Sequence, residues 1–273
     1  MNLPKDILQK IERSEHIWLM LDYDGTLADF APTPDDIFPD PELIALIQKL
    51  ANHPRITVAI ISGRRLAHIE KLLPLPGIWL AGSYGLEMRT PAKERLHRAD
   101  YDDLRPQLEQ LKPGWADLIA GQEGFYLEDK GWSLALHARF AEDQTAETTL
   151  FKARSIAEQT CREDKFQILG GHKFLEIAPC QADKGNTVVY LFRQSRSEQP
   201  FPVYLGDDDK DERAFPIVQS YGGVAGCVCH RPRSTQANFQ LESPQAVRRW
   251  LAELYRMLSS DSQDIEKRAP DRV

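Results

Sequence analysis

The sequence predicts an α/β fold in which a doubly wound, mostly parallel sheet carries an inserted α+β module. Two observations lead to this prediction. Short apolar runs without polar alternation, which are typical of strands buried on both faces of a parallel sheet, alternate with segments of helical spacing. In the middle of the chain this alternation stops, and paired strand-like segments joined by glycine-containing turns predict β-hairpins instead.

The strands of the parallel sheet are expected from four apolar runs: residues 17–21, 56–61, 78–81 and 203–205. A helix is predicted over residues 41–51, where apolar residues recur at helical spacing, with Asp40 as N-cap and Pro41 as the first helical residue. A second, short helix is predicted over residues 66–73, ending before Pro74. The alternation of strand and helix indicates a doubly wound core.

The inserted module is predicted over residues 98–180, which leaves residues 1–97 and 181–273 as a discontinuous core domain. The elements expected within the module are a hairpin over residues 124–139, a helix over 145–158 and a hairpin over 166–177. Hairpins that interrupt an α/β pattern are typical of an insertion rather than of a continuous sheet.

After the module, the parallel pattern resumes with a helix predicted over residues 186–192, which precedes the last core strand. Ser243 and Pro244 open an amphipathic helix that is expected to end near Leu258. The remaining segment, residues 259–273, is charged and polar, and is predicted to be a flexible tail.

Composition excludes several classes of protein. The chain of 273 residues has a formal net charge of −7 and no basic block, which argues against nucleic acid or an anionic membrane as its partner. No apolar run approaches the roughly 20 residues of a membrane span. The polar N-terminus lacks the apolar core of a signal peptide. We therefore expect a cytoplasmic protein; the sequence does not give its oligomeric state, and a monomer is favoured.

The four cysteines are too sparse for a disulfide-stapled secreted fold, which favours a reducing compartment. Residues 227–230, Cys-Val-Cys-His, are a candidate metal tail. However, no second Cys/His pair exists to complete a four-ligand zinc site, so an ordinary strand end is expected there.

A pair of carboxylates, Asp22 and Asp24, directly follows the first apolar run, where the chain turns at Gly25. Ligands of parallel sheets bind outside the carboxyl ends of the strands, so both side chains are expected at a binding edge. One carboxylate there can attack phosphorus while the other gives a proton to the leaving group. Asp-x-Asp-Gly is also ordinary turn chemistry, but an EF-hand is excluded because Thr26 and Thr33 stand where it needs ligands.

Two further segments can hold a phosphate. Ser62 and Gly63 follow the second strand and open the next helix, where backbone N–H groups and the helix dipole favour an anion. The alternative is that Ser62 only caps this helix. Lys184 precedes the helix predicted over residues 186–192. At the same edge it would neutralise a phosphate and keep a nucleophilic carboxylate charged.

An acidic loop, residues 206–212, follows the last core strand. It is either a solvated acidic turn or one half of a hard-cation site completed by Asp22. Mg²⁺ prefers oxygen ligands and takes one or two carboxylates together with substrate phosphate. In that case Asp22 and Asp207 are expected as direct ligands, and Asp208 and Asp211 as ligands or as partners of the ligands.

The order of these elements resembles the haloacid dehalogenase superfamily of phosphatases, over residues 17–215. The matching segments are Asp22–Thr26, Ser62, Lys184 and Gly206–Asp208. The resemblance implies a Rossmann-like core, Mg²⁺ held by Asp22, the Asp24 backbone carbonyl and Asp207, and an aspartyl-phosphate formed on Asp22. It also implies that Asp24 is the general acid and base, and that Ser62 and Lys184 hold the phosphoryl oxygens.

Within this superfamily the chain is most similar to trehalose-6-phosphate phosphatases. The similar segments are residues 61–64, 205–212, 128–130 (Glu-Asp-Lys), 137–139 (His-Ala-Arg), 176–179 and 237–251. The resemblance implies that the insert is a C2-type cap that closes over the site, and that the reaction is hydrolysis of trehalose 6-phosphate. The residues implied to bind substrate are Gly25, Thr26, Gly63, Arg64, Tyr84, Gly85, Glu87, Glu128, Lys130, His137, Arg139 and Glu176.

Several residues of the predicted cap are suited to binding a polar ligand. Alternation along residues 132–139 places His137 and Arg139 on the face opposite Trp132 and Leu134. That face is either a binding surface or a solvated exterior. Glu128, Lys130 and Glu176 could supply the donors and acceptors that a buried sugar needs.

Two departures from the family pattern leave the exact sugar open. Tyr84 replaces the usual histidine of Gly-x-His-Gly-x-Glu, and Gln181 stands where glycine is common. The alternatives are a phosphatase of another sugar phosphate, such as glucosylglycerol phosphate or a glycosyl-3-phosphoglycerate, a phosphomannomutase, or an inactive sugar-phosphate sensor. Asp22 and Asp24 are both present, which argues against the sensor.

Overall fold

The computed structural model describes residues 5–30, 36–195, 197 and 199–268. Two units can be distinguished: Met1–Leu96 with Asp183–Val273, and His97–Ala182. The insert predicted over residues 98–180 lies within the second unit. Each unit has its own sheet, and we treat the two in turn.

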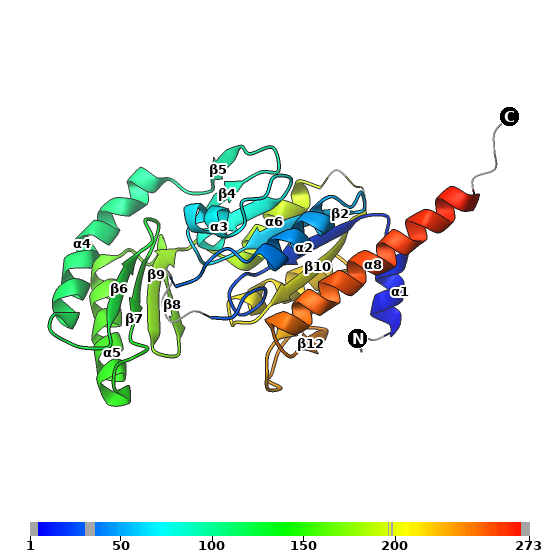
Figure 1. The fold of residues 1–273 in the computed structure, drawn as a ribbon. Helices are drawn as coiled ribbons and strands as arrows, with labels where there is room; N and C mark the ends of the chain where they lie inside the picture. The colour runs from blue at the N-terminus through cyan, green and yellow to red at the C-terminus, as the bar shows by residue number, and fades with distance from the viewer. Residues whose placement is uncertain (1–4, 31–35, 196, 198, 269–273) are drawn as a thin grey trace. The chain divides into compact units, whose positions relative to one another are not determined.

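The sheet of the first unit has eight strands within the described part of the chain, in the order β12-β11-β10-β1-β2-β3-β4-β5 (Figure 1). The strands are β1 (Ile17–Leu21), β2 (Ile56–Ile61), β3 (Trp79–Gly82), β4 (Glu87–Arg89), β5 (Arg95–His97), β10 (Phe201–Gly206), β11 (Val224–Val228) and β12 (Phe239–Leu241). The central strand β1 pairs in parallel with both β10 and β2. Strand β4 is antiparallel to its neighbour β3.

The helices of the first unit are α1 (Lys5–Arg13), α2 (Pro41–Ala51), α3 (Leu66–Leu72), α6 (Lys184–Arg193), α7 (Phe215–Ser220) and α8 (Pro244–Arg268). The start of α2 is as predicted, because the Asp40 side chain accepts hydrogen bonds from the backbone N–H groups of Glu42 and Leu43. Three-residue 3₁₀ turns, η1 (Ser83–Gly85) and η2 (Asp211–Arg213), follow β3 and β10.

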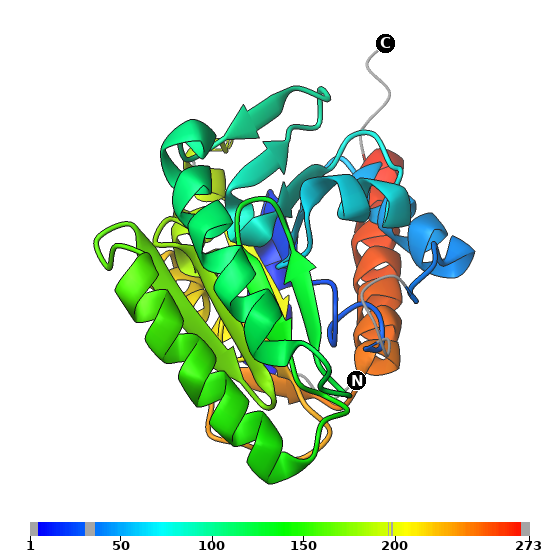
Figure 2. The same ribbon diagram turned by 90° about the vertical axis from the view of Figure 1, so that its left-hand side faces the viewer.

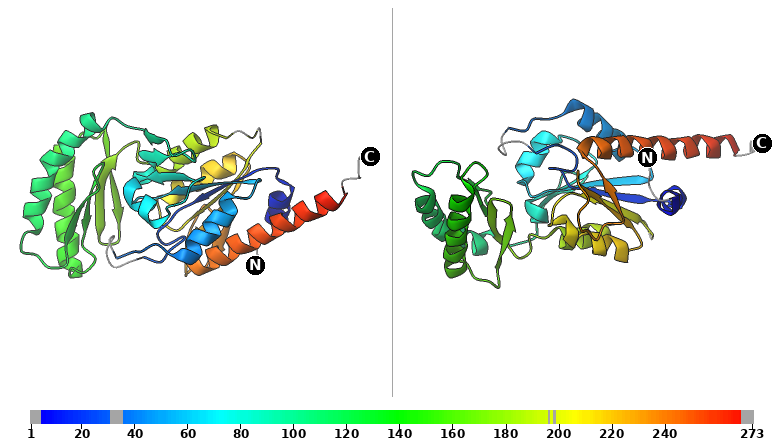
Figure 3. Two further views of the ribbon diagram at one scale, coloured as in Figure 1. Left: turned by 45° about the horizontal axis from the view of Figure 1, so that its top comes forward. Right: turned by 90° about the horizontal axis from the view of Figure 1, so that it is seen from below.

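Alternate residues of β1 enter two separate apolar cores. Leu19 belongs to a core shared with α1, α2, α3 and α8, and Met20 to a core shared with α6 and α7. Successive side chains of a strand point to opposite faces, so the two cores cover the two faces of the sheet. Figure 3 shows helices on both sides of it. The doubly wound core predicted from the sequence is confirmed.

The second unit is an antiparallel sheet in the order β6-β7-β9-β8, packed against two helices (Figure 2). Its elements are α4 (Tyr101–Ile119), β6 (Tyr126–Asp129), β7 (Leu134–His137), α5 (Asp143–Thr160), β8 (Phe166–Gly171) and β9 (Phe174–Pro179). The indole Nε1 of Trp115 on α4 donates to the carbonyl of Ala153 on α5 at 2.9 Å, which joins the two helices.

Several elements of the structure were not predicted, among them α1, α4, α7, β4, β5, β11 and β12. Helix α4 contains Pro106 and Pro113, so its sequence does not predict a helix. Strand β11 was not among the four predicted core strands, but the strand end expected at residues 227–230 is present, because β11 ends at Val228. Helix α8 continues past Leu258 to Arg268, so the segment predicted as a tail from residue 259 is helical over its first part, because no proline interrupts it before residue 270. Residues 269–273 lie outside the described residues.

No helix in the described residues has both the length and the apolar character that crossing a bilayer requires.

Candidate active site

The carboxyl ends of four neighbouring strands carry the polar residues of the candidate site. Directly after β1, β2, β3 and β10 stand Asp22, Ser62, Ser83 and Asp207. Because parallel strands end at the same edge of a sheet, segments far apart in the sequence meet there. All of these residues belong to the first unit.

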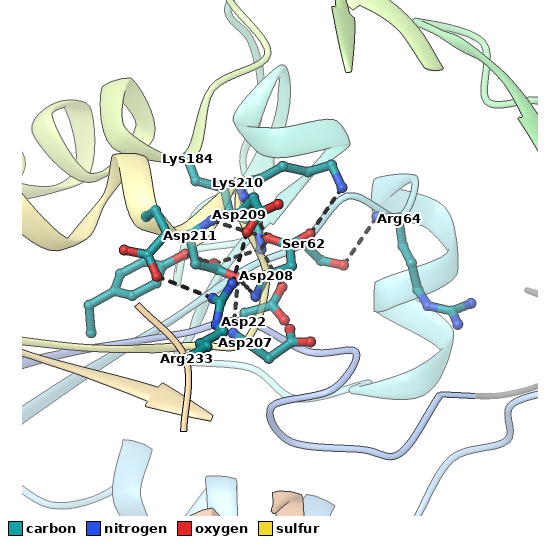
Figure 4. A network of polar contacts seen from close by, with 12 residues as sticks. Asp22, Ser62, Arg64, Lys184, Asp207, Asp208, Asp209, Lys210, Asp211 and Arg233 are labelled. Atoms are coloured by element: carbon teal, nitrogen blue, oxygen red, sulfur yellow. Dashed lines mark hydrogen bonds and ion pairs between the residues drawn. The ribbon is translucent and has the colours of Figure 1, made fainter. Parts of the chain in front are cut away.

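A buried ion pair joins the first and third of the predicted segments. The Lys184 ammonium lies 2.8 Å from an oxygen of Asp22 and 2.7 Å from an oxygen of Asp211 (Figure 4). Lys184 is the first residue of α6, and the N-cap Asp183 accepts from the backbone N–H of Asn186. Two carboxylates thus offset the unfavourable position of a cation at a helix N-terminus.

The acidic loop after β10 is folded on itself rather than solvated throughout. One oxygen of Asp211 accepts hydrogen bonds from Lys184 and from the Tyr204 hydroxyl, and the other accepts from the backbone N–H groups of Asp207 and Asp208 at 3.1 Å each. Asp211 is fully buried. The Asp211 carboxylate therefore holds the loop in place through hydrogen bonds from four donors of the protein.

Three carboxylates can approach a common cation. One oxygen each from Asp22, Asp207 and Asp211 lie within 4.8 Å of one another. Burial, reinforced by Asp207 and Asp208 and opposed by Lys184, raises the pKa of Asp22 to about 8. Burial and the neighbouring carboxylates likewise raise the pKa of Asp207 to about 7 and that of Asp211 to about 8.

The charges of this cluster are not balanced by protein cations alone. Lys184 serves Asp22 and Asp211, while Lys210 forms an ion pair with Asp208 at 3.0 Å, so Asp207 is left without an ion pair in the described residues. A divalent cation would supply the missing positive charge, and an all-oxygen donor set suits Mg²⁺. The residues present therefore fit a hard divalent cation.

Gly25 allows the first turn to approach the acidic loop. It has φ of +76°, and a Cβ atom there would lie 2.2 Å from Oδ2 of Asp207. Any other residue would push the two segments apart. The neighbouring Thr26 is fully buried, and its hydroxyl has no hydrogen-bond partner among the described residues.

Asp24 is held by Arg64. The guanidinium donates from Nε and Nη2 to the two carboxylate oxygens at 2.7 and 2.8 Å. Arg64 was expected to bind substrate, but in this structure its fork is engaged with the carboxylate proposed as general acid. A bidentate pair of this kind fixes the orientation of both side chains.

Ser62 is buried, and its hydroxyl accepts a hydrogen bond from the Arg64 backbone N–H at 3.1 Å (Figure 4). The N-cap of α3 is Arg65, so Ser62 does not occupy the capping position weighed in the sequence. Glu87 instead accepts from the backbone N–H of Leu66, in the first turn of α3, and from the Ser83 hydroxyl. Expected as a substrate-binding residue, Glu87 is used here to hold the start of α3.

Tyr84 lies against the Ser62–Gly63 turn. A Cβ atom at Gly63 would come within 2.8 Å of the Tyr84 hydroxyl oxygen, so glycine is needed for this approach. Tyr84 is buried with φ of +57°, and its carbonyl accepts from the Thr187 hydroxyl of α6 at 2.8 Å. Gly85 follows in η1. Tyr84 is thus a packed part of the structure around the Ser62–Gly63 turn.

The predicted sugar-binding residues of the second unit form two pairs on its sheet. Glu176 is fully buried and accepts from the Lys130 ammonium at 3.1 Å and from the Ser133 hydroxyl at 2.6 Å. Glu128 lies 3.0 Å from Nε2 of His137.

Glu128 and Glu176 stand opposite the same residue, Ala135, on its two sides, so both acids are on one face of this sheet. Arg139 is exposed and lies beyond the end of β7.

Three residues of the site were not singled out from the sequence. Tyr204 donates to Asp211 at 2.6 Å, and a hydroxyl within an otherwise apolar strand could have signalled it. Lys210 binds Asp208. Arg233 binds Asp209 at 2.8 Å and Glu212 at 3.2 Å, and its Nε donates to the Cys227 sulfur (Figure 4). No local pattern marks Arg233, because its partners are distant in the sequence.

The family model described as trehalose-phosphatase matches residues 20–245 of the chain. A trehalose-phosphate phosphatase of Mycobacterium ulcerans is 32% identical over 267 residues, covering 93% of this chain and 67% of that protein. One of Mycobacterium avium is 34% identical over 239 residues, covering 84% of this chain and 59% of that protein. The chain therefore spans only part of the length of these relatives.

Solved structures are similar in fold. The C-terminal domain of C. albicans trehalose-6-phosphate phosphatase superposes with a TM-score of 0.81 at 22% identity, covering 93% of this chain and 97% of that one. A haloacid dehalogenase-like hydrolase from Bacteroides thetaiotaomicron has a TM-score of 0.61 at 12% identity, covering 88% of this chain and all of that one, 100%. At these identities the likeness concerns the fold alone.

Proposed function

The chain belongs to the trehalose-phosphatase family of the haloacid dehalogenase superfamily, and from this premise we propose that it releases phosphate from trehalose 6-phosphate. The observation that carries the proposal is the buried contact of Lys184 with Asp22 beside Asp207. A positioned carboxylate, a fixed cation and a hard-metal donor set are what transfer of a phosphoryl group needs.

In the proposed reaction Asp22 attacks phosphorus and the bond from phosphorus to the sugar oxygen breaks, which leaves an aspartyl-phosphate. Asp24 gives its proton to the departing sugar oxygen. Asp24 then removes a proton from water as that water attacks phosphorus, which releases phosphate and restores both carboxyl groups. The Ser62 hydroxyl and the Lys184 ammonium hold the phosphoryl oxygens as their charge changes.

We assign the metal site to the carboxylates of Asp22 and Asp207 and the backbone carbonyl of Asp24. Asp211 is within reach, but its oxygens already accept four hydrogen bonds, so it is assigned to positioning the loop. Asp208, bound to Lys210, is assigned a similar supporting part. When bound, Mg²⁺ would neutralise negative charge on the phosphoryl group.

For the phosphoryl group we also propose Gly25, Thr26, Gly63 and Gly85 as backbone contacts. Their support is their position, because all four lie in the turns that follow β1, β2 and β3, at the sheet edge that carries the site. Arg64 and Glu87 are proposed to act indirectly, by holding Asp24 and the start of α3.

For the sugar we propose the polar residues of the second unit: Glu128, Lys130, His137, Arg139 and Glu176. Their support is that Glu128 and Glu176 share one face of the sheet, where the partly exposed Glu128 and His137 could exchange water for hydroxyl groups of a disaccharide. The four cysteines form no disulfide, which suits a reducing compartment such as the cytoplasm.

The test is phosphate release from trehalose 6-phosphate, compared by kcat/KM with that from about a dozen other sugar phosphates, in Mg²⁺ and in EDTA. We expect the highest kcat/KM for trehalose 6-phosphate, and loss of release in EDTA. A higher value for a glycosylglycerol phosphate or glycosyl-phosphoglycerate would replace the proposed substrate. Movement of phosphate between hexose positions without release would identify a mutase instead.

A further inference from the structure

A second charged pocket lies in the first unit, away from the site described above. Its volume is about 360 Å³. It is lined by Glu70, Pro74, Leu75, Pro76, Arg89, Lys93 and Arg95. None of these residues is proposed to bind metal or substrate. The pocket lies where α3 and the segment after it meet β4 and β5, elements that are adjacent in Figure 1.

Positive charge dominates this pocket. Arg89, Lys93 and Arg95 face a single carboxylate, Glu70. That carboxylate is bound by Arg95 at 2.5 Å and reaches Arg89 only at 3.9 Å. The Lys93 ammonium has no ion pair or hydrogen bond within the described residues. A surplus of cations at one place is informative in a chain whose net charge is −7.

Arg89 is the buried member of the group. Its Nη2 donates to the Leu75 carbonyl, but its Nε atom is buried and has no acceptor in the described part of the chain. Burial, together with the charge of Arg95, lowers the pKa of Arg89 despite the presence of Glu70. The Arg89 guanidinium lines the pocket, and its positive charge would attract an oxyanion bound there.

The turn that carries Lys93 is held in place. Lys93 has φ of +70°, its backbone N–H donates to the Thr90 carbonyl at 2.9 Å, and the Thr90 hydroxyl accepts from the Glu94 N–H at 3.1 Å. The backbone of Lys93 is therefore part of a hydrogen-bonded turn. Because it has no competing partner, its ammonium is available to a ligand.

The opposite wall of the pocket is apolar, formed by Pro74, Leu75 and Pro76. A volume of about 360 Å³ is within the range of small-molecule sites and exceeds the need of a bare phosphate ion. The pocket thus offers cations for an oxyanion and an apolar surface for a carbon skeleton.

We propose that this pocket binds a small organic phosphate, with the phosphate oxygens on Arg89, Lys93 and Arg95 and the carbon skeleton against Pro74 to Pro76. This is a second anion site, separate from the catalytic edge, and it does not depend on which sugar phosphate the enzyme hydrolyses.

The probes are phosphonoacetate, whose P–C bond a phosphatase does not hydrolyse, and inorganic phosphate, each titrated calorimetrically into the metal-free protein. The pocket variant is the double substitution Lys93→Gln with Arg95→Gln, both at exposed positions. The matched control is Lys71→Gln, an exposed lysine of α3 that does not line the pocket. Ser62→Ala weakens any binding at the catalytic edge.

We expect phosphonoacetate binding that persists in Ser62→Ala and Lys71→Gln and weakens at least about tenfold in the double variant. Inorganic phosphate should bind the same site more weakly, because it lacks the carbon skeleton. Equal affinity in the double variant and in Lys71→Gln, or no heat at about 10 mM probe, would overturn the proposal. Tighter binding of inorganic phosphate would overturn the organic part of it. Circular dichroism of each variant verifies the fold.

Discussion

Gly25 and Asp207 approach so closely that a single added methyl group at Gly25 would lie 2.2 Å from the Asp207 carboxylate. The two residues follow β1 and β10, strands that are neighbours in space and distant in sequence. This contact is the point at which the first acidic motif and the late acidic loop form one site. Substitution of the glycine therefore tests the geometry of the site directly.

We expect Gly25→Ala to reduce kcat by at least about 100-fold, because the turn and the loop would separate and the reacting groups would be misplaced. The measurement is steady-state phosphate release at saturating Mg²⁺. The matched control is Gly77→Ala, since Gly77 has nearly the same φ, +77°, but nothing within 4 Å of its added Cβ. Both variants carry the backbone cost, so equal activity in the two would contradict the role of the contact.

Asp22→Asn is expected to abolish turnover without unfolding the protein, because an amide cannot act as the attacking carboxylate. The raised pKa of Asp22, about 8, lies above its value in an unfolded chain, so the ionised group disfavours the metal-free fold at neutral pH. The metal-free variant should consequently melt no lower than the parent protein. Asp29→Asn, at an exposed position after the same turn, is the control and should remain active. Near-normal turnover by Asp22→Asn would remove Asp22 as the nucleophile.

Arg233→Gln should weaken the apparent affinity for Mg²⁺ several-fold while leaving kcat at saturating Mg²⁺ almost unchanged. Arg233 ties Asp209 and Glu212 of the acidic loop to Cys227 of β11, and without it the loop would be less well ordered. Activity and thermal melting, each followed as a function of Mg²⁺ concentration, measure this effect. Arg231→Gln, an exposed neighbour, is the control. If activity and melting depend on Mg²⁺ concentration in the same way in both variants, the contacts of Arg233 do not order the acidic loop for metal binding.

Lys130→Met should destabilise the second unit by about 3–5 kcal/mol, since it leaves the fully buried Glu176 carboxylate without its cation. Chemical denaturation measures the loss. The double variant Lys130→Met with Glu176→Gln should recover much of it, because the unpaired charge is then absent. If the single variant is as stable as the parent, the pair serves binding rather than the fold.

Asp129 should make the second unit sensitive to acid. Hydrogen bonds from Arg105, followed by those from Lys112 and Gly131, lower the pKa of Asp129 below its usual value. A lowered pKa contributes stability that is present above about pH 4 and is lost as the pH falls further. Melting temperature against pH should therefore fall less steeply below about pH 4 in Asp129→Asn than in the parent. If the melting temperatures of the two proteins fall in parallel below about pH 4, a group other than Asp129 controls the loss of stability in acid.

Local sequence signals predicted much of the first unit. The ends of β2 and α2 were predictable because an uninterrupted apolar run and an N-cap followed by proline act within a few residues. The same reasoning placed Asp22, Ser62, Lys184 and Asp207 at strand and helix ends, where the structure brings Asp22 and Lys184 into contact.

Other features depend on contacts that no local pattern reports. Helix α4 forms across Pro106 and Pro113 because its buried residues, among them Leu108, Leu111 and Trp115, pack strongly enough to outweigh the prolines. Arg64 and Glu87 were interpreted as substrate ligands, which stays a prediction; the sequence did not report the partners that they have in this structure, Asp24 and Leu66. A side chain's type and position suggested its chemistry, but only tertiary structure determined its partner.

The central position of β1, between β2 and β10, has a consequence for synthesis of the chain. Its partner β2 emerges from the ribosome soon after it, whereas β10 emerges only after the whole continuous segment His97–Ala182. The second unit can therefore acquire its structure while β1 still exposes one ladder edge, and such an edge is a site for mispairing during this interval. Completion of the sheet, which brings Asp22 and Asp207 together, therefore occurs late in the synthesis and folding of the chain.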